Sequence, residues 1–179
     1  DSTYHIEALR SQVPDLMERA GALVAEETGL IPSGPAGVEV VGRTAWVERN
    51  VEFFSRLMEP AEQKIAERLS QAGALGSRAA GVARSLVAAE TGALLGVLSR
   101  RVLGQYELVL PTDDSEGDVI FLVGPNVLAM ERAHQFIPDE FRFWLMLHEC
   151  AHRAQFTAVP WMQEYFLSLV QGLVESAEP

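Results

Sequence analysis

The sequence predicts an α+β protein that is predominantly helical and carries a small β-hairpin. Apolar residues recur at helical spacing in several segments, for example at Leu16, Ala20 and Val24. Two runs rich in β-branched and aromatic residues, Tyr106–Leu110 and Val119–Val123, are joined by turn-forming residues, which is typical of a hairpin. These observations together favour a helical layer around one small piece of sheet.

A chain of 179 residues, of which 48% are hydrophobic and 22% charged, is long enough for one filled core. We therefore predict a single domain over residues 1–179. Its N-terminal part, 1–103, is expected to be helical, and its second part, 104–179, is expected to hold the hairpin and two further main helices.

The elements before the hairpin follow from periodicity and from turn residues. Gly29 is a natural end for the first helix, and Pro60 suits the first turn of another. The predicted elements are a helix over 14–28, a short β-prone run over 38–41, and helices over 45–58, 60–69 and 78–103.

The elements after the hairpin are helical as well. Pro138 and Pro160 each stand where a helix can begin, and Asp139 and Glu140 place negative charge in the first turn after Pro138. The predicted helices cover 126–134, 138–156 and 160–173.

Charge and composition exclude several classes of partner. The net charge of −11 and the absence of a basic stripe argue against binding to nucleic acid. The most apolar stretch, 72–98, is interrupted by Arg78, Arg84 and Glu90, so we predict no membrane span. A single cysteine, Cys150, and no recognisable signal peptide favour the cytoplasm. The oligomeric state stays open.

The segment His148-Glu149-Cys150-Ala151-His152 matches the H-E-x-x-H pattern. Residues four apart on a helix lie about 40° apart around the axis and ~6 Å apart along it, so both imidazoles can bind one metal ion. Glu149 projects about 100° away from His148, beside a water on that ion. We predict that His148 and His152 bind zinc and that Glu149 is the general base that activates the zinc-bound water.

The residues before the motif, Phe141–Leu147, are almost wholly apolar, which predicts a motif helix buried in the middle of the domain. Buried imidazoles and a buried carboxylate need partners, and a metal supplies them more readily than an apolar core does. The alternative is that both histidines are ordinary core residues. Cys150 is expected to point away from them as a small buried side chain.

Zinc needs a third protein ligand. The long metzincin pattern is excluded, because the positions that it requires as glycine and histidine hold Gln155 and Ala158. A glutamate on a following helix is another common arrangement, and Glu175 is the candidate in this chain. Glu131 and His134, which precede the motif helix, are weaker candidates, and a ligand beyond Pro179 stays open.

The chain resembles a bacterial family of zincin-like hydrolases associated with the biosynthesis of a deazaflavin coenzyme. The resemblance covers most of the chain and rests on the runs Leu103–Tyr106, Val123–Asn126, His148–Phe156 and Val159–Trp161, with Val41, Trp46, Val47 and Asn50 in the N-terminal part. It implies a mostly helical zincin-like metallopeptidase core and a metal-binding H-E-x-x-H. Members of this family usually extend past the equivalent of Pro179, where a later helix bears a glutamate suited to complete the metal site.

We therefore predict a zinc-dependent hydrolase of the metallopeptidase type that acts on a peptide or amide bond. One alternative is a catalytically silent zincin-like module for binding or assembly, and another is hydrolysis of a non-peptide small molecule. In zincins an edge strand beside the motif helix pairs with extended substrate. Val119–Val123 is the candidate for that strand, or else a plain part of the hairpin.

Overall fold

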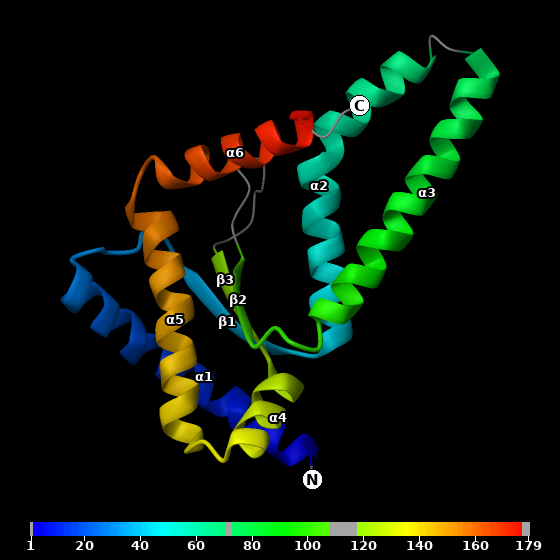
Figure 1. The fold of residues 1–179 in the computed structure, drawn as a ribbon. Coiled ribbons are helices and arrows are strands. Elements are labelled where there is room, and N and C mark those ends of the chain that lie inside the picture. The colour runs from blue at the N-terminus through cyan, green and yellow to red at the C-terminus, as the bar shows by residue number, and fades with distance from the viewer. Residues whose placement is uncertain (1, 71–72, 108–117, 177–179) are drawn as a thin grey trace. The chain divides into compact units, whose positions relative to one another are not determined.

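The structure is a computed structural model, and it describes residues 2–70, 73–107 and 118–176. These residues form six helices and a three-stranded sheet, which confirms the predicted α+β, mainly helical fold (Figure 1). In chain order the elements are α1 (Ser2–Thr28), β1 (Ala36–Val41), α2 (Arg43–Ser70), α3 (Gly73–Leu98), β2 (Gly104–Glu107), β3 (Asp118–Val123), α4 (Gly124–His134), α5 (Pro138–Ala158) and α6 (Met162–Ser176).

The chain divides into two compact units. The first combines residues 1–42 with 102–169, and the second combines 43–101 with 170–179. The first unit contains the sheet and the H-E-x-x-H helix. The single domain that we predicted stays a prediction, and each unit is described by itself.

The sheet of the first unit has the strand order β1-β3-β2. β2 runs antiparallel to β3, with Tyr106 opposite Ile120, which confirms the predicted pairing of the two runs. The rest of the predicted hairpin, 108–117, lies outside the described residues. β1, predicted only as a β-prone run, pairs in parallel with β3. The central position of β3 explains why Ile120–Val123 is apolar throughout, since a strand covered on both faces is buried along its whole length.

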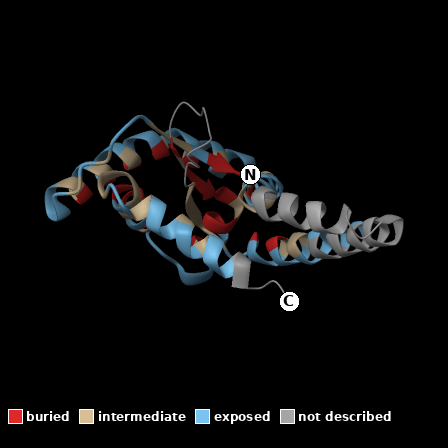
Figure 2. Cartoon of the chain, turned by 90° about the horizontal axis from the view of Figure 1, so that it is seen from above, coloured by how far each residue is buried: buried red, intermediate tan, exposed pale blue. Residues whose placement is uncertain are grey.

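The core of the first unit lies between the sheet and the pair α1 and α5, which pack against each other and against the strands (Figure 1). Ile120 and Leu122 point to this layer from alternate positions of β3. Figure 2 shows buried residues gathered in the sheet, and β3 is the most continuously buried of the three strands. The remaining core residues are Leu9, Val13, Leu16, Ala20, Val24, Val40, Val127, Leu145, Met146, Cys150 and Ala154.

α1 begins earlier than predicted. We expected the helix to start at Pro14, but it starts at Ser2 and contains Pro14 in its interior. A proline there removes one main-chain hydrogen bond. Leu9, Val13 and Leu16 nevertheless continue one buried stripe across it, so burial of apolar surface outweighs that loss.

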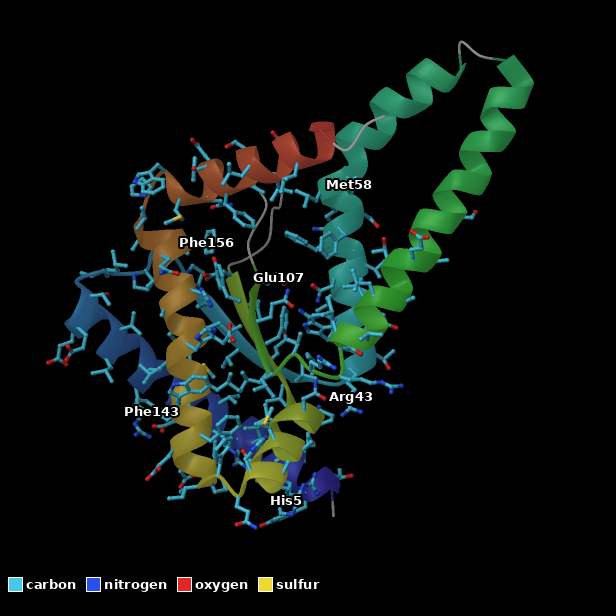
Figure 3. The ribbon with its side chains drawn as sticks, in the orientation of Figure 1. His5, Arg43, Met58, Glu107, Phe143 and Phe156 are labelled. Carbon is cyan, nitrogen blue, oxygen red and sulfur yellow. The ribbon has the colours of Figure 1, made fainter. Side chains whose placement is uncertain are left out.

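α5 has the bounds that its flanking residues predict. Ile137 and Val159 are extended on either side of it, and Pro138 occupies its first turn. Figure 3 labels Phe143 and Phe156 toward its two ends. The prediction of a helix buried all round was wrong: Met146 is fully buried, whereas Trp144 is 57% exposed. The apolar run before the motif therefore covers both a core face and a solvent face.

In the second unit, α2 and α3 pack along each other. The two helices predicted over 45–58 and 60–69 form one continuous helix, α2, which contains Pro60. The helix predicted over 78–103 is α3, which ends at Leu98 in a hydrogen-bonded turn to Arg101. Across the described residues, no helix combines the length and the apolarity needed to cross a membrane.

Candidate metal centre

The two histidines of the motif converge. His148 and His152 lie one turn apart on α5, their Nε2 atoms are 3.1 Å apart, and their rings stand at 86° to each other. Two imidazole nitrogens on one tetrahedral zinc ion lie ~3.3 Å apart, given Zn–N bonds of about 2.05 Å. His148 is exposed and His152 partly exposed, so the pair is open to solvent ions. The donor set and its spacing fit a divalent metal of the zinc type.

Glu149 lies on a different side of α5, against strand β2. Its side chain is buried, with 4% of the residue exposed, and its carboxylate accepts a hydrogen bond from the main-chain N–H of Tyr106. Gly104 allows this approach, because a Cβ atom there would stand 2.7 Å from Oε1 of Glu149. The strand therefore forms a cradle for the carboxylate.

Burial changes the acidity of this carboxyl group. Loss of hydration raises the pKa of Glu149 from 4.5 to about 7, and the hydrogen bond from Tyr106 opposes part of that rise. A group with a pKa near neutrality can both accept and release a proton at physiological pH.

A buried polar network lies beside the cradle. Nε of Arg153, the residue after His152, donates to Oδ2 of Asp118 at 2.8 Å, and its Nη2 donates to the main-chain oxygen of Gly34 at 2.9 Å. Asp118 also accepts a hydrogen bond from the hydroxyl of Tyr106, and burial together with that carboxylate raises the pKa of Tyr106. The network connects α5 to the start of β3 and to β2, the strand against which Glu149 packs.

Cys150 takes no part in the site. It is buried on the α1 side of α5, with Sγ 3.9 Å from the main-chain oxygen of Met17. Burial raises the pKa of its thiol to about 11, so it stays protonated at neutral pH. The expectation that it points into the core is confirmed.

The third ligand has no assignment. The side chain of Glu175 lies outside the described residues. Glu131 is held in a buried ion pair with Arg142, whose Nε and Nη2 lie 2.7 and 2.9 Å from its two oxygens, so it is not free to bind a metal. His134 stacks on Phe136 instead. Within the described part of the chain, no group of three His, Cys, Asp or Glu side chains could hold a metal.

The predicted substrate strand needs correction. Val119–Val123 belongs to β3, which is hydrogen-bonded on both sides and has no open edge. β1 and β2 are the outer strands of the described sheet, and β2 lies beside α5. Sequence alone suggested the wrong strand because the parallel partner of β3 is about 80 residues away in the chain, and no local pattern reveals it.

Sequence reasoning also missed four residues around the site: Gly104, Asp118, Trp144 and Arg153. An arginine among apolar residues directly after the motif was a usable signal, since a buried cation needs a carboxylate partner. The role of Gly104 had no comparable signal. It depends on a close contact between residues that are far apart in the sequence.

Two histidines converge on one helix, a buried glutamate lies between them in the sequence, and the helix packs against an outer strand of a small sheet. This arrangement is that of the zincin class of proteins. The profile of the zincin-like metallopeptidase family matches residues 1–179, and the chain belongs to this family. Its fold also matches the crystal structure of a proposed hydrolase with a novel fold from Chloroflexus aurantiacus, with 28% identity and a TM-score of 0.69. The match covers 94% of this chain and 51% of that one, so the chain spans about half the length of that relative. Comparison with curated proteins finds no match.

Proposed function

We propose that this protein is a zinc-dependent hydrolase of a peptide or amide bond, with His148 and His152 as metal ligands and Glu149 as general base. The observation that carries the proposal is the distance of 3.1 Å between the Nε2 atoms of His148 and His152. The residue after His148 is Glu149, whose carboxyl group is buried. Membership of the zincin-like metallopeptidase family supports it. The deazaflavin association and the cytoplasmic location stay predictions.

Each residue of the candidate site has its own role in the proposed hydrolysis. A bound zinc ion supplies Lewis acidity, which makes water acidic near neutral pH and polarises a carbonyl group. His148 and His152 would hold the ion. Glu149 accepts a proton from the attacking water at its carboxylate and delivers it to the leaving amine. Tyr106 and Gly104 keep that carboxylate in place.

We place an extended substrate along β2. A peptide can add to an outer strand of a sheet as a further strand. β2 is an outer strand and packs against α5 where Glu149 contacts Gly104, so a peptide bound there would pass close to Glu149. The charge of −11 makes strongly acidic peptides unfavourable substrates.

The test uses Glu149→Gln and His148→Ala. We expect the wild-type protein to bind about one zinc per chain and to cleave members of a peptide mixture in ¹⁸O-labelled water, placing the label in the new carboxyl groups. Glu149→Gln should keep the zinc and lose at least about 100-fold in rate, the usual scale of a lost acid–base group. His148→Ala should lose both zinc and cleavage.

A catalytically silent binding module is the second candidate. One observation favours it: across the residues that the structure describes, no third protein ligand joins the two histidines. That module predicts no cleavage by the wild-type protein in the peptide mixture or in a parallel panel of small amides and esters. Cleavage of the small molecules alone would support a hydrolase with a non-peptide substrate. Zinc-loaded wild-type protein that cleaves nothing would refute the hydrolase proposal.

A further inference from the structure

A run of aromatic rings leads from the end of α4 along α5 to the two histidines of the motif. His134 at the end of α4, Phe136 in the connection, and Phe141, Trp144 and His148 on α5 follow one another as near-parallel rings. Successive ring centroids are 5.3, 4.9, 6.3 and 6.0 Å apart, and successive planes differ by 18°, 30°, 15° and 21°. Trp144 is therefore flanked by Phe141 on one side and by His148 on the other.

The His148 ring has few other contacts to orient it. A metal-bound imidazole usually donates its second N–H to a carboxylate or a carbonyl, and this hydrogen bond fixes the ring. Among the described residues, the ring of His148 has a polar contact with Nε2 of His152 and ring contacts with His152 and Trp144. The Trp144 indole lies over the face of the imidazole, so it restricts rotation of the ring by stacking and not by a hydrogen bond.

We infer that Trp144 is a positioning residue of the metal site, and that it holds the His148 imidazole in its metal-binding orientation by stacking. The inference rests on the proposed function, because it assumes that His148 binds a metal. Phe141 braces the indole from its other side, at an interplanar angle of 15°. Trp144 is 57% exposed, so the ring contacts with Phe141 and His148 are what restrict its orientation.

Electrostatics adds to this role when the metal is present. An imidazole that binds a divalent cation carries part of its positive charge, and the face of an indole attracts cations within about 6 Å. The Trp144 and His148 ring centroids are 6.0 Å apart. The stack therefore stabilises the metal-loaded form more than the empty one.

The test compares four variants for metal affinity by titration calorimetry with zinc. Trp144→Ala removes the stack, and we expect the zinc dissociation constant to rise by roughly 3- to 10-fold. Trp144→Phe keeps a ring at the same place and should recover most of the affinity. Trp161→Ala is the matched control, since Trp161 is similarly exposed, at 59%, but contacts Tyr165 instead. His148→Ala should abolish the shared site.

Fluorescence gives a readout that does not depend on affinity. A Co²⁺ or Cu²⁺ ion on His148 should quench the emission of Trp144. The quenching should persist in Trp161→Phe and should be much weaker in Trp144→Phe. Equal quenching in the wild type and in Trp144→Phe would contradict the stack.

The outcomes separate this inference from the proposed function. If wild-type protein binds no zinc, or if His148→Ala binds it equally well, both are refuted. If the wild type binds zinc through His148 but folded Trp144→Ala binds it with unchanged affinity, only the positioning role of Trp144 is refuted. Loss of affinity in Trp144→Ala without recovery in Trp144→Phe would also overturn it, because stacking requires only an aromatic ring.

Discussion

At the scale of single residues, the ionisation of Glu149 affects both the chemistry of the candidate site and the stability of the fold. Its folded pKa of about 7 lies above its ordinary value of 4.5. A carboxyl group with a raised folded pKa holds its proton more tightly in the folded state. Its stabilising contribution is therefore complete below pH 4.5 and is lost as the pH rises from 4.5 through 7. Above pH 7 the buried carboxylate lowers the free energy of unfolding.

We predict that Glu149→Gln stabilises the metal-free protein at pH 8 and leaves its stability nearly unchanged at pH 4.5. Glutamine keeps the acceptor for the Tyr106 N–H but cannot ionise. The gain should be at most about 3 kcal/mol, the scale of a pKa shift from 4.5 to about 7. Urea unfolding in the presence of a chelator measures it at both pH values.

The matched control for this comparison is Glu140→Gln. Glu140 lies on the same helix but is exposed, so its substitution should change stability by less than about 0.5 kcal/mol at pH 8. Equal stability of Glu149→Gln and wild type at pH 8 would show that ionisation of the buried carboxyl group does not destabilise the fold. The general base would then have no raised pKa of this origin.

At the scale of elements, the site depends on one strand that fits tightly against one helix. β2 brings Gly104 so close to Glu149 that a methyl group on Gly104 would stand 2.7 Å from Oε1 and 3.1 Å from Cδ. The contact is a side-chain carboxyl group against a main-chain surface, so relief requires the carboxyl group or the strand to move. Either movement disturbs the position of the base.

We predict that Gly104→Ala lowers the free energy of unfolding by about 1–3 kcal/mol and reduces hydrolysis while zinc binding persists. Gly21→Ala on α1 is the control, because no atom lies within 4 Å of its added Cβ and alanine favours a helix by about 0.5–1 kcal/mol. Denaturant unfolding and zinc titration measure both effects.

A double-mutant cycle identifies the cause of the loss. In the background of Glu149→Ala the carboxyl group is absent, so the cost of Gly104→Ala should shrink by at least about half. An undiminished cost in that background would place the clash elsewhere and would remove Gly104 from the site. The cycle therefore tests the cradle directly.

The elements differ in how far sequence could predict them. α5 was predicted almost to its bounds, because Pro138 and Pro160 are local signals that act on neighbouring backbone. The motif spacing likewise predicted the convergence of His148 and His152, since one turn of helix sets it. α1 was cut short at Pro14, where a buried apolar stripe overrides the local signal. α2 was divided at Pro60, which the helix contains.

At the scale of the whole molecule, the features that sequence could not predict are those that join distant segments. The parallel pairing of β1 with β3 sets residues 36–41 beside 118–123, and it makes β3 central and β2 the edge. Periodicity reports which face of a strand is buried but not which strand lies next to it. The contact of Gly104 with Glu149 and the Asp118–Arg153 pair likewise join segments that are far apart in the sequence.

The net charge of −11 also belongs to the whole molecule, and it complicates any test for a specific metal site. An acidic protein attracts divalent cations without binding them at one place, although salt near physiological strength screens charges beyond about 8 Å. A specific site differs in two ways. It depends on named ligands, and imidazole nitrogens select zinc over the hard cations Ca²⁺ and Mg²⁺, which prefer oxygen.

We therefore predict that zinc, but not magnesium or calcium at the same concentration, raises the melting temperature of the protein in physiological salt. Binding to the folded state alone adds about 2.7 kcal/mol of stability at a free ligand concentration 100 times the dissociation constant. The gain should vanish in His148→Ala and in His152→Ala. It should persist in His5→Ala, which removes an exposed histidine on α1 (Figure 3). A zinc-dependent rise that survives loss of both motif histidines would place the cation elsewhere, and an equal rise with magnesium would reduce the effect to screening of the acidic surface.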